Sequence, residues 1–131
     1  MRATRAIIDL VQLQANIKAI RKRLHEHKSI QRKNQTPRIC LIIKSSAYGH
    51  GAIPVARAAL QAGIDQFGVS TVAEGVELRE AGITAPILLL CATVPDEVSE
   101  IVRANMVALC GDATIGQDLA RAATSQGRII D

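Results

Sequence analysis

The sequence predicts an α/β fold in which helices cover a parallel sheet. Two observations predict this class. A unit of about twenty residues recurs, in which a helix-like stretch ends at a turn residue and an apolar run follows; the turn residues are Gly63, Gly82, Asn105 and Gly127. Glycine and asparagine tolerate the left-handed conformation that closes helices. The apolar runs are also continuous rather than alternating, as in strands that are buried on both faces.

The apolar runs are the expected strands. They cover residues 39–43, 67–69, 87–90, 107–109 and 129–130. Residues 38–131 therefore read as about four βα units, with a fifth strand beginning at Arg128. Parallel strands need crossover connections, and the stretches between these runs are long enough to hold helices.

The first two connecting helices have clear start signals. Pro54 suits the first turn of a helix that runs to Ala62, because a missing N–H costs nothing there. Thr71 and Glu74 form a capping-box pattern, in which each side chain satisfies a free backbone N–H of the helix start. This second helix should end before Gly82.

Two further helices follow. Pro95, with acidic residues after it, suits the start of a helix that reaches Ala104. Ile115, Leu119 and Ala122 fall on one face of the last helix, which would pack that face on the sheet.

A different segment precedes these units. Residues 4–9 read as a short strand, within a leading segment of residues 1–10. The apolar residues that follow recur at the spacing of one helix face: Leu13, Ile17, Ile20 and Leu24. Asp9 can cap this helix, with Gln12 at the third helical position. Residues 29–37 are polar and basic, and we expect a loop there.

Composition limits the function. The 131 residues, 48% of them hydrophobic, form one domain over residues 1–131. The net charge is +4, but only 2% of residues are aromatic, which argues against nucleic-acid stacking platforms. No apolar stretch approaches the roughly 20 residues of a membrane span, and no signal peptide is evident, so we expect a cytoplasmic protein. Three isolated cysteines and scattered histidines predict neither a disulfide nor a metal site.

Two architectures suit consecutive right-handed βαβ units, an open sheet and a closed (β/α)8 barrel. A complete barrel needs about 250 residues, so length alone favours the open sheet. In both architectures, ligands bind at the carboxyl ends of the strands. Lys44 lies at that end of the first strand of the series, where its amine can act as a nucleophile. Taken alone, this position is better explained by an ordinary surface lysine.

The neighbours of Lys44 change that balance. Residues 44–51 read Lys-Ser-Ser-Ala-Tyr-Gly-His-Gly and include Tyr48, the only tyrosine. This run resembles the cofactor-attachment motif of alanine racemases, which commonly reads Lys-Ala-Asn/Asp-Ala-Tyr-Gly-His-Gly. The likeness continues at residues 5–10, 77–83 and 85–88 and covers essentially the whole chain. Two serines follow the lysine, and Cys91 stands where a glycine is common, so the departures leave Lys44 and Tyr48 in place.

The resemblance implies a pyridoxal-phosphate enzyme with an N-terminal (β/α)8 barrel and a C-terminal β domain. Lys44 would form the aldimine with the cofactor and act as one of two bases, Tyr48 would bind the cofactor phosphate, and Leu90 would contact the cofactor. The implied reaction interconverts L-alanine and D-alanine for peptidoglycan, in a homodimer. The chain would be the N-terminal part of the barrel, and its leading strand would join the β domain in space.

Family chains run to more than twice this length. The second catalytic base, a tyrosine of the C-terminal domain, has no counterpart here, so we expect an N-terminal fragment that is inactive alone. Open sheet edges and an exposed barrel interior should make it self-associate. Two alternatives stay open: a non-catalytic pyridoxal-phosphate-binding barrel, and a stand-alone open-sheet binding module suggested weakly by Gly49 and Gly51.

Overall fold

A computed structural model describes residues 4–26 and 37–129 of the chain. Its elements, in order, are α1 (Leu10–Glu26), β1 (Cys40–Ile42), α2 (Lys44–Tyr48), α3 (Ala52–Gln61), β2 (Gln66–Val69), α4 (Val72–Glu80), β3 (Ile87–Ala92), a 3₁₀ turn (Pro95–Glu97), α5 (Val98–Arg103), β4 (Val107–Leu109) and α6 (Ala113–Ser125). The four strands lie side by side in chain order, and each pairs with its neighbour in parallel. The predicted α/β class and its parallel sheet are therefore confirmed.

The residues that the sequence predicts as helix caps do cap the helices in the structure. Asp9 accepts the N–H of Gln12 at 2.9 Å and caps α1. Thr71 and Glu74 form the reciprocal capping box of α4. The carboxylate of Asp112 accepts two N–H groups at the start of α6, so each of these helices begins at a side chain that satisfies its free donors.

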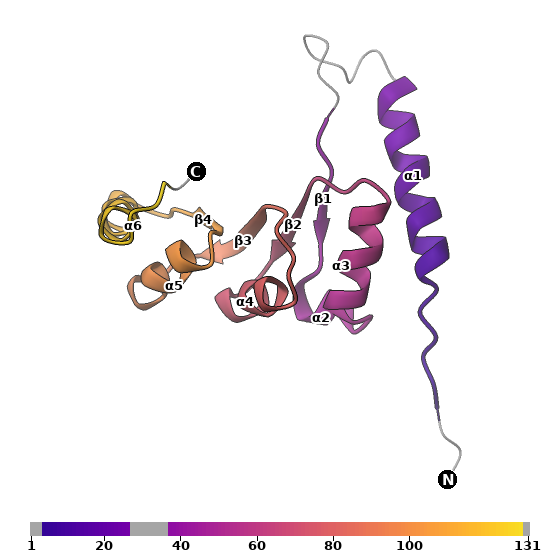
Figure 1. Ribbon diagram of the computed structural model, residues 1–131, viewed down its shortest axis with the longest axis horizontal. Coiled ribbons are helices and arrows are strands. Elements are labelled where there is room, and N and C mark those ends of the chain that lie inside the picture. The colour runs from indigo at the N-terminus through magenta and orange to yellow at the C-terminus, as the bar shows by residue number, and fades with distance from the viewer. Residues whose placement is uncertain (1–3, 27–36, 130–131) are drawn as a thin grey trace.

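The core lies between the sheet and the helices on one of its faces. Alternate strand residues point to this face and are fully or almost fully buried: Ile43, Phe67, Val69, Ile87 and Leu89. Figure 1 shows α3, α4 and α5 on this side of the strands. Burying each large side chain stabilises the fold by about 1.5–3 kcal/mol, so this layer is the main source of stability.

The opposite face of the sheet is uncovered by the described part of the chain. Leu90 of β3 is 40% exposed and Leu109 of β4 is 52% exposed. In a closed barrel, the residues of this face would point into the interior. The four consecutive parallel βα units, with helices on one side only, agree with a partial (β/α)8 barrel rather than with a doubly wound sheet, which carries helices on both faces.

Helix α1 stands outside the βα units and packs against α3 (Figure 1). The side-chain amide of Gln14 donates to the carbonyl of Ala58 at 3.1 Å and to Gln61 at 2.9 Å. Ile17, on the same helix, is buried in the hydrophobic core. These contacts fix the leading helix on the outside of the first βα unit.

Two predicted strands are not formed by the described residues. Residues 4–9 run extended into α1 without pairing with any described strand, and the side chain of Ile7 is 90% exposed. A strand needs the backbone of a neighbouring strand for its N–H and C=O groups. The resemblance places that neighbour in a C-terminal β domain, so the leading strand stays a prediction. Residues 128 and 129 are also not in a strand, and Ile130 lies outside the described residues.

Two smaller expectations change or stay open. The helix expected to run from Pro95 to Ala104 is divided into the 3₁₀ turn and α5, so the proline begins a tight turn rather than the α-helix itself. The loop expected at residues 29–37 falls outside the described residues, apart from residue 37. None of the described helices is long and apolar enough to span a membrane.

Candidate functional site

Lys44 lies at the carboxyl end of β1, as its sequence position predicts. The N–H of Ile43 donates to the carbonyl of Gly68 at 2.9 Å, so the pairing of β1 with β2 extends to the residue before the lysine. Lys44 is the first residue of α2, and it is partly buried. The sheet therefore holds the backbone directly before Lys44 in place.

The turn after Lys44 is left-handed, which the sequence does not predict. Ser45, Ser46 and Ala47 have φ angles of 51°, 52° and 53°, and Tyr48 has 56°. Each non-glycine residue in this conformation costs about 1–2 kcal/mol, because Cβ crowds the following carbonyl oxygen. Four in succession are a concentrated strain next to one lysine. Strain of this kind persists only where surrounding contacts hold it, and it gathers at functional sites.

Backbone hydrogen bonds close the turn. The N–H of Gly49 donates to the carbonyl of Ser45 at 3.0 Å, and the N–H of Gly51 donates to that of Ser46 at 2.8 Å. Both glycines have positive φ angles, 83° and 89°, which favour glycine over other residues. The two glycines of the motif thus end the left-handed turn and allow α3 to begin.

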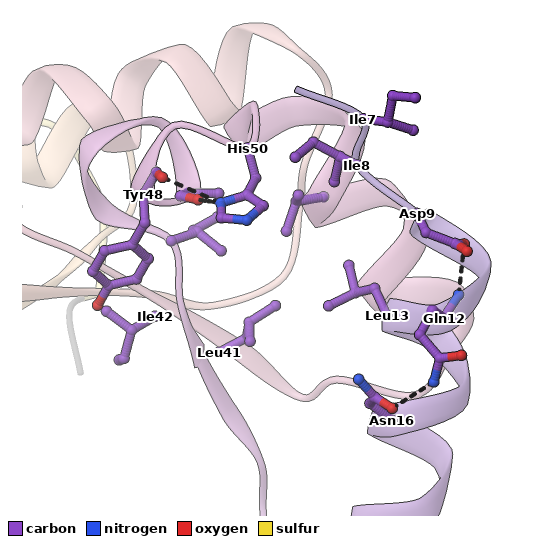
Figure 2. Close-up of a pocket in the computed structure, with 13 residues that line it drawn as sticks. Ile7, Ile8, Asp9, Gln12, Leu13, Asn16, Leu41, Ile42, Tyr48 and His50 are labelled. Carbon is purple, nitrogen blue, oxygen red and sulfur yellow. Dashed lines mark hydrogen bonds between the residues drawn. The ribbon is translucent and has the colours of Figure 1, made fainter. Parts of the chain in front are cut away.

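His50 has a local structural role in this turn. Its Nδ1 lies 2.8 Å from the carbonyl oxygen of Ala47 and 3.2 Å from that of Tyr48, so one ring nitrogen can donate to both. Figure 2 shows the His50 imidazole directed back at these carbonyls, while the Tyr48 ring points to another side of the turn. These contacts favour His50 as a loop residue that hydrogen-bonds locally.

Glu74 connects the Lys44 turn to the next βα unit. Its Oε1 accepts the N–H of Ser45 at 2.7 Å. Its Oε2 accepts the N–H groups of Ser70 at 2.8 Å and of Thr71 at 3.2 Å. The sequence identified Glu74 only as a capping residue. The signal for its second contact was the topology, because the carboxyl ends of β1 and β2 must be neighbours in a parallel sheet.

Tyr48 and Leu90 are both accessible to a ligand. Tyr48 is 58% exposed, and its hydroxyl makes no hydrogen bond within the described residues. Leu90 lies on the uncovered face of the sheet. A Cβ added at Gly68 would lie 3.2 Å from Leu90 Cδ1 and 2.6 Å from Ile42 Cδ1, so the side chains of Ile42 and Leu90 approach each other over this glycine. Ile42 precedes Lys44 by two residues, which places Leu90 near the end of β1 that carries the lysine.

A pocket of about 470 Å³ lies between the leading segment and β1 (Figure 2). It is lined mainly by apolar residues of the leading segment, α1, β1 and α3, and it reaches Tyr48 and His50. Lys44 and Leu90 do not line it, although Ile42 does. Among the described residues, no histidines, cysteines or carboxylates gather into a group that could hold a metal ion.

Comparison with known proteins agrees with the motif. The model of the alanine racemase N-terminal domain matches residues 8–131. An alanine racemase of Treponema denticola is 46% identical over 121 residues, which are 92% of this chain and 30% of that protein. An alanine racemase of Symbiobacterium thermophilum is 39% identical over 128 residues, 98% of this chain and 31% of that protein. The chain thus spans about a third of the length of these relatives.

Solved structures agree as well. Alanine racemase from a D-cycloserine-producing Streptomyces lavendulae is 32% identical with a TM-score of 0.77, over 94% of this chain and 30% of that one. A Clostridium difficile alanine racemase in complex with cycloserine is 30% identical with a TM-score of 0.75, over 93% and 30%. A histidine racemase from Leuconostoc mesenteroides, 20% identical, shares the fold with a TM-score of 0.74 over 92% and 30%. Matched along almost its whole length by this family model, the chain belongs to the family of alanine racemase N-terminal domains.

Proposed function

We propose that this chain provides the cofactor-binding lysine and part of the cofactor site of an alanine racemase, which interconverts L-alanine and D-alanine with pyridoxal phosphate. One observation carries the proposal most directly. Lys44 lies at the carboxyl end of β1 and begins a strained left-handed turn that contains Tyr48. Ligand sites of parallel α/β folds lie at this end of the strands.

The residues present fit pyridoxal phosphate. Its aldehyde requires a primary amine, which Lys44 supplies. Its phosphate requires hydrogen-bond donors, and the exposed hydroxyl of Tyr48 has no partner within the described residues. Leu90 offers an apolar surface for the flat ring, on the face of the sheet that no described helix covers. When bound, the cofactor acts as an electron sink that stabilises negative charge at the substrate Cα.

Each site residue of the chain would have its own role in the reaction. The Lys44 amine would bind the cofactor and, once released by the substrate amine, would hold or return a proton at one face of Cα. Tyr48 would fix the phosphate, and Leu90 would fix the ring. Racemisation needs a proton donor on each face. The single tyrosine of this chain is then occupied by the phosphate, so it cannot also be the second base, which the resemblance places in a C-terminal domain.

We therefore propose that the 131-residue chain alone does not racemise alanine, and that activity belongs to a longer protein. Relatives named alanine racemase are about three times as long as the part that this chain matches. By the same proposal, the longer enzyme is a homodimer that makes D-alanine for peptidoglycan. The three cysteines are free, which fits a reducing compartment such as the cytoplasm.

Reductive trapping tests the assignment of Lys44. The chain is incubated with pyridoxal phosphate, reduced with borohydride and digested, and the label is located by mass spectrometry. Lys44→Ala is compared with Lys18→Ala, which removes an exposed lysine of α1. We expect label concentrated at Lys44, lost in Lys44→Ala and retained in Lys18→Ala. Label spread evenly over the surface lysines would contradict the proposal for this chain.

A second measurement separates an enzyme from a non-catalytic cofactor-binding protein. The purified chain is incubated with pyridoxal phosphate and L-alanine in deuterium oxide, and exchange at Cα is followed by proton NMR. Faster exchange than with Lys44→Ala would support a proton-transferring lysine, since one base suffices for exchange. Retention of cofactor at Lys44 with no acceleration would favour the non-catalytic alternative.

A further inference from the structure

Glu74 uses its two carboxylate oxygens for two different elements. Oε2 accepts the N–H groups of Ser70 and Thr71 at the start of α4, at 2.8 and 3.2 Å. Oε1 accepts the N–H of Ser45 at 2.7 Å, 29 residues earlier in the chain. A capping box requires only one acceptor atom from this side chain. The contact with Ser45 is therefore additional to the capping role.

The bond to Ser45 acts on the backbone of the lysine itself. The N–H of Ser45 belongs to the peptide group that joins Lys44 to the turn, so holding it fixes the rotation of that peptide plane. Ser45 is also the first of the four left-handed residues. The backbone hydrogen bonds of the turn begin with the N–H of Ala47, which donates to the carbonyl of Ile43 at 2.9 Å, so the N–H of Ser45 depends on Glu74 for its partner.

Charge makes this contact stronger than a neutral one. A backbone N–H bound to a carboxylate is a charge-assisted hydrogen bond, shorter and roughly twice as strong as a neutral pair. The backbone N–H groups of Ser70 and Thr71 hold the carboxylate, whereas the Thr71 hydroxyl accepts only the backbone N–H of Glu74, at 3.2 Å. The carboxylate is thus anchored on α4 and reaches across to the strained turn from a fixed position.

We propose that Glu74 is a positioning residue that holds the left-handed turn after Lys44 and thereby orients the Lys44 amine for reaction. The part of this proposal that concerns the reaction of the Lys44 amine rests on the function proposed above. The part that concerns the hydrogen bond between Glu74 and the turn does not. Glu74 touches the backbone of Ser45, and its carboxylate makes no ion pair with the Lys44 amine within the described residues. Its effect on chemistry is therefore indirect, through the direction in which the lysine leaves the strand.

Glu74→Gln separates the two contacts. Glutamine has one acceptor oxygen where glutamate has two, and it serves well in a capping box. The variant should keep its oxygen on the α4 start and leave the Ser45 N–H without a carboxylate. Glu77→Gln is the matched control, because Glu77 is an exposed glutamate of the same helix. Thr71→Ala is a second control that weakens the cap but leaves the carboxylate.

Two readouts are needed. Amide hydrogen exchange by NMR reports the hold on Ser45, and the rate of reductive pyridoxal-phosphate trapping reports the Lys44 amine. In Glu74→Gln we expect exchange at Ser45 to rise about tenfold and trapping at Lys44 to slow. In Glu77→Gln both should match the wild type. In Thr71→Ala, exchange should rise at the start of α4 and stay slow at Ser45.

The outcomes distinguish this inference from the proposed function. Unchanged exchange at Ser45 and unchanged trapping in Glu74→Gln would overturn the positioning role. Equal acceleration at Ser45 in Thr71→Ala would also overturn it, since the effect would then belong to the cap alone. If the pyridoxyl label in the wild-type chain is not concentrated at Lys44, the proposed function fails. Amide exchange at Ser45 then still tests whether Glu74 holds the turn. Should Glu74→Gln not fold, Glu74→Asp, one methylene shorter, takes its place.

Discussion

The guanidinium of Arg21 lies 2.6 Å from the carboxylate of Asp65, which joins the leading helix to the start of β2. The same carboxylate accepts the N–H of Ile39 at 2.6 Å, directly before β1. Arg21 also donates to the carbonyl of Gly63. One carboxylate therefore connects α1, the entry to β1 and the turn before β2, and it fixes the first βα unit against the helix outside it.

This junction makes stability depend on pH. Partial burial acts to raise the pKa of Asp65, but the hydrogen bonds from Ile39 and Arg21 outweigh it, so the pKa lies below its ordinary value of 3.8. A lowered folded-state pKa contributes stability that is present above the unfolded value and is lost as the pH falls through the folded value. The contribution should therefore be complete at neutral pH and disappear in acid.

Asp65→Asn tests that expectation. It removes the charge and one acceptor, so at pH 7 we expect a loss of about 1–3 kcal/mol in the free energy of unfolding. The difference from wild type should shrink progressively as the pH falls from about 4 through the lowered folded-state pKa of Asp65, because the wild-type carboxylate becomes protonated over that range. Urea unfolding monitored by circular dichroism at several pH values measures both. A constant difference across the whole range would contradict an electrostatic origin.

Arg79 joins two turns that lead into neighbouring strands. Its Nη1 donates to the carbonyls of Ile83 and Ala85 at 2.7 and 2.8 Å, before β3. Its Nε and Nη2 donate to Ala104 and Asn105 at 2.8 Å, before β4. Burial lowers the pKa of Arg79, but arginine keeps its charge across the physiological range. The spread of N–H donors on the planar guanidinium, rather than its charge, is what allows Arg79 to bind both turns.

Arg79→Lys should therefore destabilise the fold although the charge is kept. An ammonium group cannot reach four carbonyls in two turns, and carbonyls whose bonds to Arg79 are partly buried would lose their partner, so we expect a loss of about 1–3 kcal/mol. Arg57→Lys is the matched control, because exposed Arg57 makes one bond, to the carbonyl of Ala81 at 3.2 Å. Equal midpoints of chemical unfolding for the two variants would show that this spread of donors is not needed.

Two glycines in helices should respond oppositely to alanine. A Cβ at Gly75 in α4 would collide with the sulfur of Met106, whose side chain is 4% exposed and has little room to move. Gly75→Ala should cost about 1–3 kcal/mol through overpacking. At Gly116 in α6 a Cβ meets no atom within 4 Å, and Gly116→Ala should stabilise by about 0.5–1 kcal/mol. Thermal unfolding of the pair measures both signs, and a stabilised Gly75→Ala would contradict the packing.

Sequence reasoning was most successful where local signals and the global fold agree. The capping residues Asp9 and Thr71 mark helix starts in the sequence and begin helices in the structure. The continuous apolar runs likewise correspond to the four parallel strands. Residues 4–9 pair with none of the described strands, because an apolar pattern cannot show where the neighbouring strand lies, and their strand stays a prediction. The motif placed Lys44 at a strand end correctly. The roles of Lys44, Tyr48 and Leu90 stay predictions.

The left-handed turn at Ser45 to Tyr48 shows the limit of local reasoning. None of its four residues is a glycine, so propensity opposes the conformation that they adopt. The bond between Glu74 and Ser45 spans 29 residues, and only the parallel pairing of β1 and β2 brings the two together. Conformations that depend on distant contacts are not encoded in the residues that adopt them.

The uncovered face of the sheet predicts self-association of the chain. Leu90 and Leu109 are 40% and 52% exposed there, and β1 and β4 are edge strands with free backbone groups. Leu109→Lys places a charge on this face beside the β4 edge and should shift the chain toward monomer by several-fold in dissociation constant. Ile20→Lys is the control, since Ile20 is also 52% exposed but lies on α1, away from the face. Analytical ultracentrifugation over a concentration series measures the shift. A wild-type chain that stays monomeric at high concentration would show that the exposed leucines do not drive association.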